Sequence, residues 1–125
     1  MTDKTDHIRK LNDLARTQPA IVNAIWVITP GVEALLASGS ESCGAQHEAN
    51  SARTAALRHA VATFNDFPEG NDPYREHDFG NFELFDNKLF WKIDYYHPDR
   101  DTLAPEPANI ELCRRVLTIM LAEEY

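Results

Sequence analysis

The chain has 125 residues, of which 43% are hydrophobic and 26% charged, and its formal net charge is −8. These values are typical of one soluble globular domain with a single core, which we expect to span residues 1–125. No apolar run approaches the roughly 20 residues of a membrane span, and the N-terminus lacks the basic and apolar segments of a signal peptide. Two cysteines, Cys43 and Cys113, form no disulfide framework. We therefore expect a cytoplasmic protein that does not associate with membranes.

The negative charge is concentrated in one part of the chain. Residues 1–65 hold six acidic and six basic residues, whereas residues 66–106 hold eleven acidic residues against four basic ones, a net charge of −7. Such a field repels phosphate backbones, so we expect no direct binding of nucleic acid. It suits a basic protein surface, a cationic ligand or a divalent metal. An acidic surface that only keeps the protein soluble is the commoner explanation.

The first half of the chain predicts three helices and one strand. Residues 4–17 carry apolar residues at helical spacing, and Pro19 follows them. Residues 21–29 are rich in β-branched side chains and predict a buried strand. Thr29 and Pro30 have the types preferred at the N-cap and first position of a helix, which we expect to end near residue 37. Residues 38–44 have loop composition, and a longer helix is expected over residues 46–65.

A β-hairpin over about residues 79–96 is the most specific structural prediction. Asp86-Asn87 supplies two residues that tolerate positive φ, as a two-residue turn requires. With that turn, paired residues have numbers that sum to 173, and moving the turn by one residue is expected to exchange the two faces. One face then carries apolar side chains that should meet a core: Phe82, Leu84, Leu89, Trp91, Ile93 and Tyr95.

The opposite face of this hairpin mixes aromatic and ionisable side chains. A sheet face partly covered by a helix, with charges at its rim, would explain this mixture, and a binding or catalytic surface is the alternative. Lys92 and Asp94 are two residues apart on one strand, so we expect them to form an ion pair and to be at least half covered. The candidate binding surface on and beside this face comprises His77, Asp78, Glu83, Lys92, Asp94 and Tyr96.

The last part of the chain predicts a crossover and a final helix. Residues 97–107 contain three prolines, and Asn109 can cap a helix over residues 109–124 whose apolar residues form one stripe. Glu123 and Glu124 would lie at the C-terminus of that helix, where the dipole disfavours negative charge. Either this end frays or a cation lies close to it, for which the candidates are Lys92, Arg58 and Arg115.

Motifs for known catalytic sites are missing from the sequence. We find no nucleophile elbow, no phosphate-binding glycine loop and no zinc-binding His-Glu-x-x-His helix. His77, Asp78, Asp94 and His97 could gather at the open end of the hairpin, and such side chains suit zinc or manganese. Adjacent strand residues point to opposite faces, so His77 and Asp78 cannot both reach one ion without a bulge. We expect no metal and no cofactor.

Three segments carry a family resemblance: residues 71–80 (Asn-Asp-Pro-Tyr-Arg-Glu-His-Asp-Phe-Gly), residues 90–96 (Phe-Trp-Lys-Ile-Asp-Tyr-Tyr) and residues 115–125. They resemble the signature blocks of the domain-of-unknown-function family DUF3768, small alphaproteobacterial proteins that are often encoded on plasmids. Residues 38–50 depart from the shorter link usual in that family. The resemblance implies a bacterial cytoplasmic setting and a tie to mobile elements, and it brings no catalytic role.

The expected fold class is α+β, with a small antiparallel sheet made of the hairpin and the 21–29 strand, packed against three main helices. The expected function is that of a non-enzymatic interaction or inhibitor protein whose acidic hairpin region docks on a basic protein partner. The alternative is a small enzyme or ligand-binding protein that uses His77, Lys92, Asp94 and Tyr96. A concave site with convergent polar groups would favour this alternative. The sequence leaves the oligomeric state open.

Overall fold

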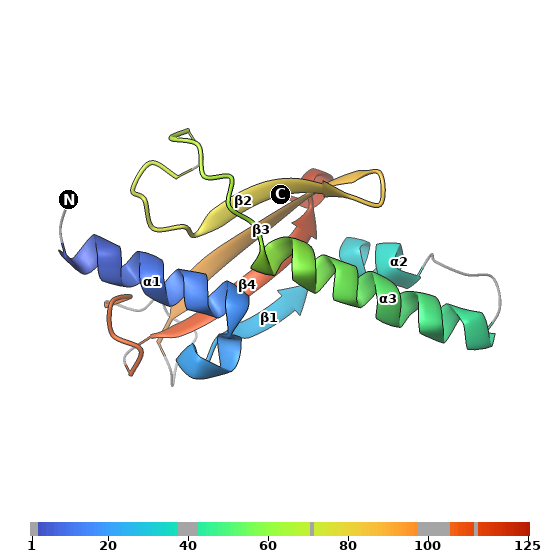
Figure 1. The fold of residues 1–125 in the computed structure, drawn as a ribbon, viewed down its shortest axis with the longest axis horizontal. Coiled ribbons are helices and arrows are strands. Elements are labelled where there is room, and N and C mark those ends of the chain that lie inside the picture. Colours follow the sequence, from blue (N-terminus) through green and yellow to red (C-terminus); the bar gives the residue numbers. More distant parts are fainter. Residues whose placement is uncertain (1–2, 38–42, 71, 98–105, 112) are drawn as a thin grey trace.

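The computed structural model describes residues 3–37, 43–70, 72–97, 106–111 and 113–125 (Figure 1). In chain order the helices are α1 (Asp3–Thr17), the 3-10 turn η1 (Pro19–Val22), α2 (Pro30–Ala37), α3 (Cys43–Ala62) and the 3-10 turn η2 (Ala122–Glu124). The strands are β1 (Ile25–Ile28), β2 (Phe79–Leu84), β3 (Asn87–Tyr96) and β4 (Arg114–Leu121). The expected α+β class is therefore confirmed. Among the residues described, none of the helices combines the length and apolar character needed to cross a bilayer.

The four strands form one mixed sheet in the order β1-β4-β3-β2. The β2–β3 and β3–β4 pairs are antiparallel, but β1 pairs with β4 in parallel. The expected purely antiparallel sheet is therefore wrong, because β4 lies between the hairpin and β1. A parallel pair needs a long crossover between its strands, and here the connection contains α2, α3 and the hairpin.

The helix expected over residues 109–124 is also wrong, since residues 114–121 form a strand. Val116, Thr118 and Ile119 are β-branched and favour extended backbone. Alternate residues Arg115, Leu117 and Ile119 are almost fully buried on one side of the strand. The arginine conceals this alternation in the sequence. A central strand also carries apolar residues on its other face, and the two sets together resemble a helical stripe.

The hairpin forms as predicted, but its turn lies one residue earlier. Phe85 and Asp86 occupy the turn with φ values of 53° and 61°, and paired residue numbers sum to 171, as in Leu84 with Asn87. This change of two in the sum leaves every residue on its predicted face, so the expected exchange of faces is wrong. Phe85 packs against the core and the guanidinium of Arg53 lies 4.5 Å from its ring centroid. These tertiary contacts offset the cost of positive φ in a phenylalanine.

One face of the sheet, called the inner face, meets all three helices. Figure 1 shows α1 and α3 lying across the sheet. The core cluster joins inner-face residues of β3 and β4 to residues of α1, α2 and α3, and its members include Leu11, Ala15, Val32, Leu36, Leu57, Val61, Leu89, Trp91, Leu117 and Ile119. Trp91 is fully buried, as the predicted face requires. The opposite, outer face contributes no residue to this cluster.

The remaining expectations are met in part. The helices expected over residues 4–17, from Pro30 to about residue 37, and over residues 46–65 are confirmed within a few residues. The strand expected over residues 21–29 is shorter, because Pro19–Val22 form a 3-10 turn before it. The expectation that it is buried is wrong, because β1 lies at the edge of the sheet and three of its four residues are exposed. Residues 38–42 of the expected loop and residues 98–105 of the expected crossover lie outside the described residues, and α3 already begins at Cys43.

The acidic C-terminus serves as a cap for α2 and does not end the α-helix expected over residues 109–124. Glu124 accepts hydrogen bonds from the Thr29 hydroxyl at 2.6 Å and from the Gly31 N–H at 3.1 Å. Its carboxylate therefore lies at the N-terminus of α2, where the helix dipole favours negative charge. The hydrogen bond from Thr29 is the main reason that the pKa of Glu124 is lowered. The expectation that this end either frays or lies close to Lys92, Arg58 or Arg115 is thus wrong, because Thr29 and Gly31 hold Glu124.

Candidate functional site

A hollow of about 630 Å³ opens on the outer face beside the hairpin. We call it the outer pocket. Three aromatic rings form one wall: Phe79 and Phe90 lie 5.3 Å apart between ring centroids, and Tyr125 lies 5.9 Å and 5.4 Å from them, close to edge-to-face. The residues that line the outer pocket are Gly70, Asp78, Phe79, Asn81, Phe90, Lys92, Ile93, Asp94 and Tyr125.

Two carboxylates in the outer pocket differ in their partners. Asp94 Oδ2 forms an ion pair with Lys92 Nζ at 2.9 Å, and the side chains of Asp94 and Lys92 are 32% and 38% exposed. The predicted ion pair, more than half covered, is therefore confirmed. Hydrogen bonding to Asp94 is the largest cause of the raised pKa of Lys92. Asp78 makes no ion pair with any cation in the described part of the chain.

The electrostatics around Asp78 oppose its ionisation. Burial is the largest cause of its raised pKa, and the nearby carboxylates of Asp72 and Asp94 raise the pKa further, while a hydrogen bond from its own backbone and the nearby His77 oppose the shift in part. The pKa of Glu76 is raised for the same reasons, by burial first and then by Asp78 and Asp72. These carboxylates repel one another. In the free protein, nearby cations therefore compensate the negative charge of these carboxylates only in part.

The other predicted site residues do not join this pocket. Glu83 lines a separate hollow of about 400 Å³ with Lys88 and Phe90. Tyr96 is the last residue of β3 and pairs with Arg114. The structure thus brings together Asp78, Lys92 and Asp94 of the six predicted residues, and leaves His77, Glu83 and Tyr96 outside the lining.

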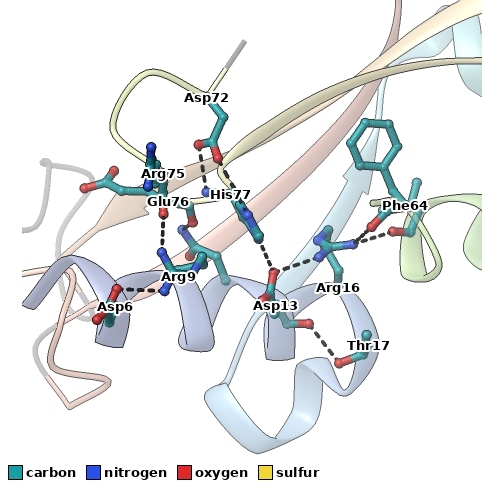
Figure 2. A network of polar contacts seen from close by, with 12 residues as sticks. Asp6, Arg9, Asp13, Arg16, Thr17, Phe64, Asp72, Arg75, Glu76 and His77 are labelled. Atoms are coloured by element: carbon teal, nitrogen blue, oxygen red, sulfur yellow. Dashed lines mark hydrogen bonds and ion pairs between the residues drawn. The ribbon is translucent and has the colours of Figure 1, made fainter. Parts of the chain in front are cut away.

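His77 belongs instead to a polar network on α1 (Figure 2). Its Nδ1 and Asp13 Oδ1 are joined by a 2.8 Å hydrogen bond, and its backbone N–H donates to Asp72 Oδ1 at 3.0 Å. Its Nε2 lies 3.6 Å from Asp72 Oδ2. The imidazole stacks on the Phe67 ring at 3.7 Å between centroids. Both ring nitrogens thus face carboxylates.

The segment that presents His77 has an unusual backbone. His77 has a φ of 55° and Arg75 a φ of 56°, a region that non-glycine residues occupy only when surrounding contacts hold them. On the other side of Asp13, Arg16 forms a 2.8 Å ion pair and donates to the Phe64 carbonyl. The network therefore fastens the acidic approach to the hairpin onto α1 and the end of α3.

A second buried connection ties α1 to the sheet. Arg115 is fully buried, donates from Nε to Asn12 Oδ1 at 2.6 Å and also donates to the Pro107 carbonyl. Asn12 in turn donates to the Tyr95 hydroxyl at 2.8 Å. Burial lowers the pKa of Arg115. These residues stabilise the inner face and lie away from the outer pocket lining.

Sequence reasoning missed several residues that shape this region. Asp13 lies 64 positions from His77, and its place on α1 resembles an ordinary solvated position. Tyr125 was not predicted to join the rings of the hairpin, because the residues before it, 109–124, were expected to form a helix and not a strand beside the hairpin. Gly70 lines the outer pocket from the irregular segment before β2. No spacing in the sequence signals any of these contacts.

The donor set offers no evident metal centre. In the part of the chain that the structure describes, no group of three or more His, Cys, Asp or Glu side chains is placed to hold a metal ion. The sequence suggested His77 and Asp78 as ligands of one metal ion, but His77 lies in the network with Asp13 and Asp72, whereas Asp78 lines the outer pocket. What the outer pocket combines is an aromatic wall, one carboxylate without a cation partner and one carboxylate paired with lysine. Aromatic faces and carboxylates both attract cations.

Comparison with known proteins places the chain in one family. Neither the curated proteins nor the solved structures contain a match to it. The model of the family described as "Protein of unknown function (DUF3768)" matches residues 28–124. This range runs from the end of β1 to η2 and includes every residue that lines the outer pocket except Tyr125. Because the match covers well over half of the chain, the protein belongs to the DUF3768 family.

Proposed function

We propose that this chain is a non-enzymatic interaction protein that docks on a basic protein partner through the outer pocket and the acidic region around it. The observation that carries the proposal is Asp78, a largely buried carboxylate without a cation partner among the described residues, beside three aromatic rings on the outer face. A lysine or arginine side chain from a partner would supply the missing positive charge and lie against the rings. Residues 66–106, with a net charge of −7, would attract such a surface from a distance.

The family resemblance adds a biological setting to this proposal. A bacterial cytoplasmic protein encoded on a plasmid would encounter the host's DNA-binding and defence enzymes, whose surfaces are basic where they contact DNA. An acidic protein can inhibit such an enzyme by occupying the surface that otherwise binds phosphate. The proposed role is therefore that of an inhibitor that mimics the charge of DNA.

The outer pocket is concave and gathers Asp78, Lys92 and Asp94, and this shape favours the alternative of a small enzyme or ligand-binding protein. The residues named for that alternative do not all meet there. The alternative requires His77, Lys92, Asp94 and Tyr96 in one pocket, and only Lys92 and Asp94 line the outer pocket. His77 is held by Asp13 and Asp72 and stacked on Phe67. A general acid or base needs to reach a substrate proton directly or through one water. The docking proposal uses the residues that do come together.

The experiment measures binding of a fluorescently labelled, arginine-rich peptide by anisotropy. Asp78→Asn and Phe90→Ala are expected to weaken binding, and added salt is expected to weaken binding to the native chain steeply. Glu111→Gln is the matched control, because it also removes one negative charge but lies on an exposed residue outside the outer pocket. Equal effects of Asp78→Asn and Glu111→Gln would mean that the peptide senses only net charge. Binding that resists salt would contradict the proposal.

A further inference from the structure

The free edge of β1 is an exposed apolar strand. β1 lies at the end of the sheet and pairs only with β4 among the described strands. Ile25, Val27 and Ile28 are 42%, 39% and 40% exposed, and Ile21 just before the strand is 56% exposed. An edge strand with unpaired backbone groups is a ready template for another strand. Proteins usually protect such edges by keeping the strand very short or by placing lysine or proline in it. Ile25–Ile28 is short, with four residues, but it contains neither lysine nor proline.

The charge distribution around this edge indicates what can cover it. Residues 18–32 contain no charged side chain, although the chain as a whole carries a net charge of −8. The charged side chains that other elements place beside β1 are of both signs: Arg58 lies near the Trp26 ring, and Glu111 and Arg114 line a hollow with Ile25. A basic partner would be attracted to the acidic hairpin region, not to this neutral segment. Two copies of the chain repel each other over most of their surfaces, and they can approach most easily where both are neutral. The β1 edge is such a surface, and it is complementary to itself.

The backbone also specifies how two copies would pair. The Thr29 N–H donates to the Ile119 carbonyl on β4. Since backbone groups alternate in direction along a strand, those of Trp26 and Ile28 point away from β4, toward the free edge. In an antiparallel pair related by a twofold axis, Trp26 of one copy can then exchange hydrogen bonds with Ile28 of the other. The axis passes beside Val27, which lies opposite its own equivalent.

We propose that two copies of this chain associate through antiparallel pairing of β1, centred on Val27, to form one continuous eight-stranded sheet. Twofold symmetry makes such an interface isologous, so a single patch suffices for both partners. The helices of both copies then lie on the same side of the joined sheet, and the outer pockets remain open on the other side. The exposed Ile25 and Val27 side chains extend the same outer face across the joint.

Cross-linking through single cysteines tests both the association and its register. In a non-hydrogen-bonded antiparallel pair the Cα atoms are about 4.5 Å apart, which lies within the range of a disulfide. In a Cys43→Ser background, Val27→Cys is therefore expected to form a disulfide-linked dimer under mild oxidation. Ile25→Cys is the matched control, because it has similar exposure but lies opposite Thr29, roughly 13 Å from its equivalent by strand spacing. Equal cross-linking of the two variants, or none with Val27→Cys, overturns the proposed pairing.

Sedimentation of the native protein across a dilution series tests the dimer without modification. We expect a monomer–dimer equilibrium that added salt shifts toward dimer, since salt screens the repulsion between two acidic chains. Val27→Lys should remain folded by circular dichroism and sediment as a monomer, because it places two ammonium groups opposite each other. A native chain that is monomeric at every concentration, or a Val27→Lys variant that still dimerises, refutes the inference. The opposite salt dependence distinguishes this association from docking on a basic partner.

Discussion

Gly80 is the glycine whose replacement tests the packing under the outer pocket most directly. A Cβ at this position would lie 2.3 Å from Nε1 and 2.6 Å from Cε2 of Trp91, and 2.7 Å from Cε1 of Phe64. These atoms belong to rings that cannot move easily, because Trp91 is fully buried and meets Phe64 edge to face. Overpacking of this kind costs about 1–3 kcal/mol. Replacing a glycine within a strand by alanine also stabilises the folded state by roughly 0.5–1 kcal/mol, because the unfolded chain loses conformational freedom.

We therefore expect Gly80→Ala to lower the free energy of unfolding by about 1–2 kcal/mol. Gly70→Ala is the control, because a Cβ there meets no atom within 4 Å and the residue has no positive φ. That variant should be neutral or stabilised by about 0.4–1 kcal/mol. Urea denaturation followed by circular dichroism measures both changes without relying on tryptophan fluorescence.

A double-mutant cycle identifies the clash as the cause. Trp91→Phe removes the two nearest atoms, and the indole N–H that it loses is buried without a hydrogen-bond partner in the described structure. The cost of Gly80→Ala should therefore fall by at least about 0.5 kcal/mol in the Trp91→Phe background. Rescue remains partial, because the contact with Phe64 persists. A Gly80→Ala variant as stable as the native chain, or costs that simply add, would refute this account of the core.

Two predictions concern pH. The pKa of Asp78 is raised above its ordinary 3.8, mainly by burial, so the folded state binds a proton more tightly than the unfolded state does. Ionisation of Asp78 therefore lowers the stability of the fold as pH rises through the folded pKa. Asp78→Asn should be more stable than the native chain at neutral pH, and urea denaturation should show that this advantage shrinks in acid. The pKa of Glu124 is lowered by the Thr29 hydrogen bond, so its stabilisation is present above the unfolded pKa and lost as pH falls. Glu124→Gln should destabilise the chain at neutral pH and converge with it in acid. A pH-independent difference in either variant contradicts these explanations.

The sequence alone determined the elements that depend on local pattern. The helical spacing of residues 4–17 and the Thr29-Pro30 helix start survive in the fold. The hairpin faces also survive, with Trp91 buried inside and the Lys92–Asp94 pair outside. An alternation with period two depends on the pleat of the strand itself. It therefore persists even when the turn moves by one residue.

The tertiary structure alone decided the remaining features. Residues 114–121 carry apolar side chains that fit a helix or a central strand, and the pairing with β3 and β1 selects the strand. Contacts with Arg53 and the core place Phe85 in a turn that local preference assigns to Asn87. His77 bonds to Asp13 on α1 and so does not line the outer pocket, and Glu124, which follows β4, bonds to Thr29 at the start of α2. These outcomes depend on residues that are far apart in sequence, whose interaction energies exceed local preferences only once the fold brings them together.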